Sequence, residues 1–288
     1  MVNGDDFLVP RNIATSSVLL ADSVQVENAI GQRPQLTGDV FAMRDQYKAL
    51  ADRANAIRTI SQNINVEDRK VNAKLTVRTY TSTAVPAGSN LLPVGLYFYR
   101  GGFCSGDLES EDTFCRLLAE RLPCIVISSA GGNLALAVAR RLIVLGRKHE
   151  VKGIAAIAPF VVHPDGVPLH YKTHYRSFDE LGDGPINTKQ AMTQFYEAIQ
   201  APPSDPEVYV LNAEVDLRQL PPTYLAVCGI DPLRDDGLII HDALKTAGVS
   251  VKLDYYQGLP HVFWAFECPA PSGDFVADVL AVRTFTRT

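Results

Sequence analysis

Three side chains that lie far apart in the sequence could together perform nucleophilic catalysis on a carbonyl group. Ser129 opens the stretch Ser-Ala-Gly-Gly-Asn, Asp231 precedes Pro-Leu-Arg-Asp, and His261 follows a proline. A serine hydroxyl is a weak nucleophile until an adjacent base takes its proton. Histidine can take that proton, and an aspartate can fix the histidine tautomer and stabilise the imidazolium. The sequence therefore predicts a relay formed by Ser129, His261 and Asp231.

Each of the three residues also has a purely structural interpretation. Ser129 could cap the helix that follows it, and Asp231 could cap a helix that begins with a proline. His261, after a strand and an expected turn over 257–260, could be a loop histidine packed against aromatic side chains. All three follow predicted strands at the edge where open α/β sheets place functional residues. Their joint occurrence favours catalysis.

Alternating strands and helices are expected to position these residues. The sequence predicts strands over 74–80, 94–99, 124–128, 153–158, 223–228 and 249–255. It predicts helices over 111–122, 133–146, 188–199, 232–247 and 275–288. This alternation indicates an α/β fold, with a mostly parallel sheet and helices on both faces. We expect 1–288 to be a single domain with an N-terminal helical cap segment over 1–60. A second cap or insertion segment over 160–220 breaks the alternation and is expected to wall the substrate site.

Glycines and aromatic residues surround the three candidates in the sequence. Gly101 and Gly102 end a predicted strand, where a loop could supply amides to a developing oxyanion. Ala130 follows the candidate nucleophile, and its amide would point to the same place. Four aromatic residues could line an apolar pocket or belong to the ordinary core: Tyr99, Phe103, Phe263 and Trp264.

Composition excludes several other classes of function. The chain has 288 residues, 47% of them hydrophobic, and a net charge of −5, which argues against a nucleic-acid-binding surface. We expect no membrane span and no signal peptide, because no apolar stretch is long enough and 1–11 lacks an apolar core. Five cysteines without a CxxC pair favour free thiols and a cytoplasmic protein. His170 and His174 have helical metal spacing, but no acidic partner is evident and we expect no metal. The oligomeric state stays open, a homodimer included.

Taken together, the motifs resemble the hormone-sensitive-lipase group of α/β-hydrolases, and within it fungal esterases of the versiconal hemiacetal acetate esterase type. The motifs are Gly-Gly-Phe-x-x-Gly-Asp, Ser-Ala-Gly-Gly-Asn, Asp-Pro-Leu-Arg-Asp and Leu-Pro-His. Their order, serine then acid then histidine, is that of the α/β-hydrolase triad. The resemblance implies a nucleophile, an orienting acid and a base at Ser129, Asp231 and His261. It also implies oxyanion amides at Gly101, Gly102 and Ala130. The implied reaction is hydrolysis of a small apolar, polyketide-type ester through an acyl-serine, without metal or organic cofactor.

The chain departs from this group just before the candidate nucleophile. Strand 124–128 runs straight into Ser129, whereas the group has several dozen residues between the corresponding strand and its serine. Ile127 stands where the first glycine of the nucleophile turn belongs, and Arg100 precedes the glycine pair. Two alternatives therefore stay open. The fold could serve as a lyase or cyclase with His261 acting as base, or as an inactive binding remnant.

Overall fold

The computed structural model describes ten stretches of the chain: residues 34–56, 60–73, 75–84, 94–99, 101–121, 127–128, 130–214, 216–265, 275–279 and 281.

The main sheet has four described strands, all parallel, in the order β3-β4-β5-β6. They are β3 (Ile127–Ser128), β4 (Ile154–Ile157), β5 (Thr223–Ile230) and β6 (Val251–Pro260). Every residue of β4 is buried, as expected for a strand covered on both faces. The strands predicted over 153–158, 223–228 and 249–255 are thus confirmed. Of the strand predicted over 124–128, the last two residues are described, and both pair with β4.

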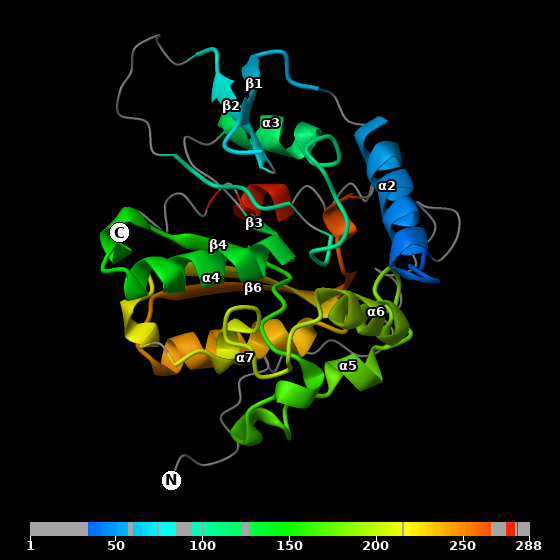
Figure 1. Cartoon of the computed structure of the whole chain (residues 1–288), viewed down its shortest axis with the longest axis vertical. Coiled ribbons are helices and arrows are strands. Elements are labelled where there is room, and N and C mark those ends of the chain that lie inside the picture. Colours follow the sequence, from blue (N-terminus) through cyan, green and yellow to red (C-terminus); the bar gives the residue numbers. More distant parts are fainter. Residues whose placement is uncertain are drawn as a thin grey trace.

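Helices cover both faces of this sheet, as predicted (Figure 1). Along β4, Ile154 and Ala156 join a hydrophobic cluster with α4 (Ala130–Val144) and α7 (Arg234–Thr246). Ala155 and Ile157 join the opposite cluster, which includes α3 (Asp112–Arg121), the end of α2 (Val40–Ala56) and the helical turn 275–279. This alternation follows from the period of two along a strand. The helices predicted over 111–122, 133–146 and 232–247 are confirmed.

A separate hairpin lies with α3 at one end of the molecule (Figure 1, top). It consists of β1 (Ile64–Lys70) and β2 (Thr76–Ser82), which pair antiparallel and confirm the strand predicted over 74–80. Arg78 of β2 forms ion pairs with Asp68 of β1 and Asp112 of α3. These contacts fasten the hairpin to the helix.

The strand predicted over 94–99 is wrong, because these residues form no regular secondary structure. The segment nevertheless lies across the sheet edge, with Tyr97 packed against one hydrophobic cluster and Phe98 against the other. A strand needs a hydrogen-bonded neighbour along its length. β3 is the end strand of the described sheet, and its two described residues pair with β4. No described strand is therefore paired with 94–99. Tyr97 and Phe98 are half-buried, whereas Val94, Leu96 and Tyr99 are exposed, so the apolar pattern of 94–99 indicates neither sheet pairing nor full burial here.

The described parts of the two segments predicted as caps pack against each other. Between β4 and β5 the chain forms α5 (Ser177–Glu180) and α6 (Lys189–Ile199), and α6 confirms the helix predicted over 188–199. Side chains of α5 and α6 share a hydrophobic cluster with Leu36 and with Met43 of α2. The remaining turns are 3₁₀: Lys148–Glu150, Pro164–Gly166, Leu169–Tyr171, Val210–Asn212, Leu217–Gln219 and Phe263–Ala265.

Two buried aspartates at the start of α7 fasten the segment between β4 and β5. The Oδ1 atom of Asp236 accepts hydrogen bonds from the amides of Val161 and Val162, at 2.8 and 3.2 Å. The Oδ2 atom of Asp235 accepts hydrogen bonds from the amides of Arg176 and Ser177, at 2.6 and 2.7 Å. Burial raises the pKa of Asp236 to about 8.

Candidate active site

The parallel pairing of β5 and β6 brings Asp231 and His261 together. Ile230 pairs with Pro260, so the next residues along the two strands, Asp231 and His261, leave the sheet side by side. His261 Nδ1 lies 2.6 Å from Asp231 Oδ2, and the two residues are 5% and 1% exposed. The Oδ1 atom of Asp231 accepts a hydrogen bond from the Leu233 amide at 3.0 Å. Both carboxylate oxygens thus have partners, and the carboxylate holds the imidazole ring in one orientation.

A β-bulge next to the Asp231–His261 pair sets the register between β5 and β6. The ladder passes from the pair Cys228 and Tyr256 to the pair Ile230 and Pro260, so β6 holds two more residues than β5 over this step. The turn expected over 257–260 is therefore wrong, because β6 continues to Pro260. At Gly229 the strands are so close that a Cβ atom would lie 1.9 Å from a backbone oxygen of β6. Bulges of this kind re-aim side chains next to active sites.

The predicted glycine loop lines the same pocket as His261. Gly101, Gly102 and Phe103 all have positive φ, at +128°, +58° and +64°. The Gly101 carbonyl accepts hydrogen bonds from the Cys104 and Ser105 amides, at 3.0 and 2.8 Å. A Cβ atom on Gly101 would lie 2.1 Å from the Ser105 carbonyl oxygen, so this turn requires glycine there. The loop thus brings its backbone to the pocket, and its role as an oxyanion hole stays a prediction.

The predicted nucleophile, Ser129, lies outside the described residues. In the chain it stands between the end of β3 at Ser128 and the start of α4 at Ala130. The first amides of a helix have no partner within the helix, which makes the Ala130 amide suitable for binding an anion. Gly132 packs closely on β4, where a Cβ atom would lie 3.4 Å from the Ile157 amide nitrogen. The structure therefore describes two members of the predicted relay and the backbone on either side of the third.

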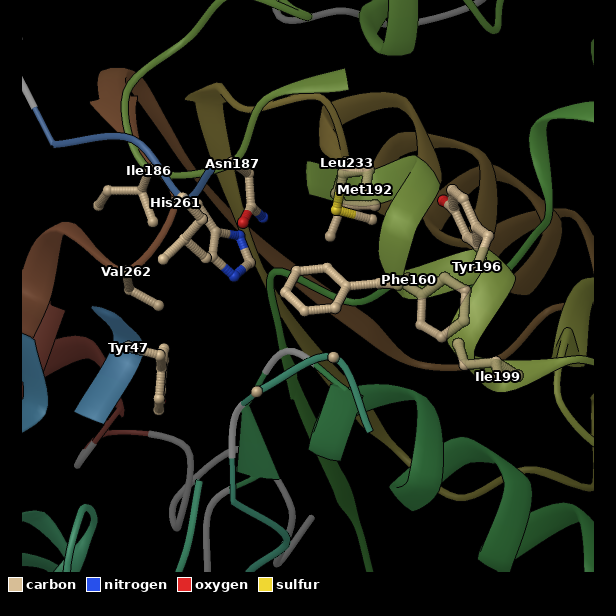
Figure 2. A pocket seen from close by; sticks show the side chains of 14 residues that line it. Tyr47, Phe160, Ile186, Asn187, Met192, Tyr196, Ile199, Leu233, His261 and Val262 are labelled. Atoms are coloured by element: carbon tan, nitrogen blue, oxygen red, sulfur yellow. The ribbon is translucent and has the colours of Figure 1, made fainter. Parts of the chain in front are cut away.

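A mostly apolar pocket opens beside His261 (Figure 2). Its empty space is about 550 Å³, part of which is open to solvent. Polar side chains are few among its described residues, and Asn187 is one that sequence reasoning missed. The lining residues are Leu36, Tyr47, Gly101, Gly102, Phe160, Ile186, Asn187, Met192, Phe195, Tyr196, Ile199, Leu233, His261 and Val262. Four of them come from α6, inside the segment that was expected to wall the site.

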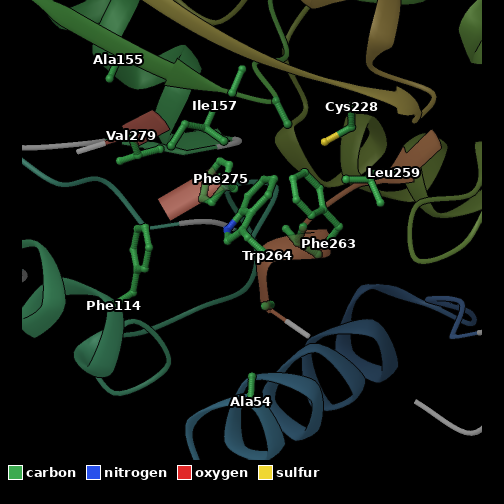
Figure 3. Close-up of a cluster of buried hydrophobic side chains, with 14 of the residues drawn as sticks. Ala54, Phe114, Ala155, Ile157, Cys228, Leu259, Phe263, Trp264, Phe275 and Val279 are labelled. Carbon is green, nitrogen blue, oxygen red and sulfur yellow. The ribbon is translucent and has the colours of Figure 1, made fainter. Parts of the chain in front are cut away.

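The four aromatic residues predicted to line the pocket are not among these fourteen. Phe263 and Trp264 are 0% and 2% exposed and belong to the core, where Trp264 stacks on Phe275 at 4.5 Å (Figure 3). Tyr99 and Phe103 are 45% and 42% exposed. The Phe103 ring contacts Phe160, a lining residue, edge to face at 5.7 Å. Sequence proximity to His261 was misleading, because the residues after it turn back into the core.

Other sequence features receive a structural explanation. His170 lies in a 3₁₀ turn with its ring 4.1 Å from that of Tyr171, so the helical spacing to His174 is not realised by an α-helix. Within the described stretches, no three His, Cys, Asp or Glu side chains gather where they could hold a metal ion. Cys104, Cys115 and Cys228 are free cysteines. No helix in the described part of the chain has both the length and the apolar character needed to cross a membrane.

Comparisons with known proteins agree with this geometry. A family model described as alpha/beta hydrolase fold matches residues 128–265, which include Ser129, Asp231 and His261. Versiconal hemiacetal acetate esterase of Emericella nidulans is 34% identical over 62% of this chain and 76% of its own length. The chain belongs to the α/β-hydrolase family. The resemblance stated from the motifs is confirmed, and with it the enzyme class, a hydrolase of carboxylic esters.

Solved structures of this hydrolase fold extend the match. Vibralactone cyclase superposes with a TM-score of 0.76 over 91% of this chain and 94% of its own, at 22% identity. Brefeldin A esterase, a bacterial homologue of human hormone-sensitive lipase, has a TM-score of 0.72 over 92% of this chain and 93% of its own, at 21% identity. At these identities the likeness concerns the fold.

The hydrolase is shorter than its relative within the matched region. The match to the Emericella nidulans enzyme extends over 219 aligned positions, but 62% of this 288-residue chain is about 179 residues. About 40 aligned positions thus have no counterpart here. This difference agrees in size with the several dozen residues expected before Ser129.

Proposed function

We propose that this chain is a serine esterase that hydrolyses a carboxylic ester of a small apolar metabolite through an acyl-serine intermediate. The observation that carries the proposal is the 2.6 Å contact between His261 and Asp231, buried beside the pocket that the glycine loop also lines. The fungal relatives, named versiconal hemiacetal acetate esterases, support an ester of a polyketide-type secondary metabolite as the substrate.

In the first half of the reaction, the Ser129 hydroxyl oxygen attacks the carbonyl carbon of the ester. Its proton passes to His261 Nε2, while Asp231 holds Nδ1 and stabilises the imidazolium. The amides of Gly101, Gly102 and Ala130 stabilise the oxyanion, and loss of one such donor typically costs about 3 kcal/mol of transition-state stabilisation. The bond to the alcohol oxygen then breaks, and the alcohol leaves with the proton from His261.

In the second half, water attacks the acyl-serine. His261 takes a proton from the water and returns it to the serine oxygen as the acid product leaves. The burial of the acid–base pair favours this exchange, because electrostatic stabilisation is stronger where water is excluded. The largely apolar pocket would bind the ring system of the substrate.

Two alternatives make different predictions. A lyase or cyclase would use His261 as a base without an acyl-enzyme, and the fold of vibralactone cyclase supports this alternative. An inactive binding remnant is suggested by the aligned positions that the chain lacks. Both alternatives predict that Ser129 does not become acylated.

A fluorophosphonate probe separates the three functions. We expect intact-protein mass spectrometry to show one adduct on the wild-type protein and on Ser82→Ala, a control on the β1–β2 hairpin, but none on Ser129→Ala. We expect p-nitrophenyl acetate hydrolysis to follow the same pattern. An unlabelled protein that still converts aryl esters without hydrolysing them would support the lyase. An unlabelled protein with hydrolysis no faster than Ser129→Ala would support the binding remnant.

A further inference from the structure

Asn187 is a buried amide in the pocket whose side chain has no hydrogen-bond partner among the described residues. The residue is 5% exposed and lines the pocket together with His261. In Figure 2 the Asn187 amide and the His261 imidazole are seen at the same end of the pocket, next to Phe160. The Asn187 amide atoms are not among the polar atoms fully enclosed without a partner, so they face the pocket, where a bound ligand can hydrogen-bond them.

The backbone on both sides of Asn187 is fixed. Ile186 has a φ of +68°, which is unfavourable for a β-branched residue. Its amide donates to the Pro34 carbonyl at 2.6 Å, and its carbonyl accepts from the Leu36 amide at 3.0 Å. On the other side, the Thr188 hydroxyl accepts a hydrogen bond from the Ala191 amide and caps α6.

Strained backbone of this kind persists where the surrounding structure holds it, and it is concentrated at ligand sites. Here the strained residue directly precedes the unpaired amide, and together they place a hydrogen-bonding group on a mostly apolar wall. Phe160, Met192 and Leu233 line the pocket around it. The missing partner of the amide is therefore expected to come from the ligand.

We propose that Asn187 is a specificity-determining residue that hydrogen-bonds a hydroxyl group of the substrate near the scissile ester. The inference rests on the proposed esterase function and names its substrate class: aromatic esters that carry a free hydroxyl. An amide offers both a donor and an acceptor, and a hydroxyl can satisfy both. A pocket built around such a bond discriminates strongly against analogues without the hydroxyl, because the amide is then left unpaired.

The test compares 1-naphthyl acetate with 1-naphthyl acetates that carry one hydroxyl group, at different ring positions. For the wild-type protein, we expect kcat/KM for at least one isomer to exceed that for 1-naphthyl acetate by about tenfold or more. Asn187→Leu, similar in size but without hydrogen-bonding atoms, should lower kcat/KM for the hydroxylated ester by about tenfold more than for 1-naphthyl acetate, and so lose this preference. Asn187→Thr, which retains a hydroxyl, should keep part of the preference. Asn65→Leu, the same change on the exposed face of β1, should behave like the wild type.

The outcomes distinguish the inference from the function on which it rests. A purely structural role for Asn187 would lower kcat/KM for all esters by one factor, together with the melting temperature, and would overturn the inference alone. A preference that survives in Asn187→Leu, or the absence of any preference in the wild type, would also overturn the inference alone. A wild-type protein that hydrolyses none of the esters and takes up no fluorophosphonate would overturn the esterase proposal and this inference with it.

Discussion

Gly229 offers the sharpest test of how the acid–base pair is positioned. A Cβ atom at this position would lie 1.9 Å from the Gln257 oxygen and 2.4 Å from the Gln257 carbonyl carbon. Real Cβ contacts below 3.0 Å are essentially absent, so Gly229→Ala must push β5 and β6 apart by about 1 Å. Neighbouring strands lie about 4.8 Å apart, and this displacement is large enough to break the nearest ladder hydrogen bonds.

The size of the effect follows from the bonds that are lost. Each unpaired buried backbone group costs about 1 to 3 kcal/mol, so the loss of one bond, with two groups unpaired, predicts a destabilisation of about 2 to 6 kcal/mol. The same displacement would separate Asp231 from His261, which now lie 2.6 Å apart. A misplacement of about 1 Å in a catalytic group can cost about a hundredfold in rate.

Urea unfolding and kcat/KM for p-nitrophenyl acetate measure the two effects. Gly248→Ala is the matched control, because a Cβ atom there would have nothing within 4 Å. Its cost should be about 1 to 2 kcal/mol, which comes from the positive φ of +77° alone, with unchanged kcat/KM. A Gly229→Ala variant whose free energy of unfolding lies within about 1 kcal/mol of the wild-type value, with unchanged kcat/KM, would show that the bulge does not position the Asp231–His261 pair.

Three further predictions concern the relay, the buried acid and the loop. Asp231→Asn should lower kcat about ten-thousand-fold at neutral pH with little change in fold, and a loss below tenfold in ester hydrolysis would contradict the relay. Because burial raises the pKa of Asp236 from 3.8 to about 8, the folded protein binds a proton that the unfolded protein releases. The free energy of unfolding should therefore fall as pH rises through this window. Urea titrations at pH 5 and pH 8 measure this fall. It should be smaller in Asp236→Asn than in the wild type, and an equal fall in both proteins would contradict the prediction. Gly102→Ala places a Cβ atom at φ +58° and 3.0 Å from the Phe195 ring, so kcat/KM should drop while the melting temperature changes by a few degrees; unchanged kinetics would remove the loop from the site.

The sheet and the acid–base pair were predictable because their signals are local. Buried parallel strands such as β4 and β5 read as continuous apolar runs, and the residue after such a strand lies at the functional edge of the sheet. Asp231 and His261 needed no more than this rule to be placed on the same edge. The hydrophobic period likewise predicted α6 within a proline-rich segment.

The remaining features depend on contacts that the sequence does not display. The stretch before Pro260 contains glycine and proline and resembles a turn, but pairing with β5 across the bulge keeps it in the strand. Phe263 and Trp264 look like pocket residues until the helical turn at Phe275 is seen to enclose them. Asn187 carries no motif, because its importance comes from the positive φ of its neighbour and from its place in the pocket lining.

The acid–base pair and much of the pocket lining belong to different elements of the fold. Asp231 and His261 continue two paired backbones, whereas four lining residues project from a helix outside the sheet. Libraries that vary Met192, Phe195 and Ile199 could therefore redirect this hydrolase to new esters while its proton-transfer machinery stays intact. Related enzymes can likewise change the residues on this helix, and with them the substrate, while the acid–base pair stays the same.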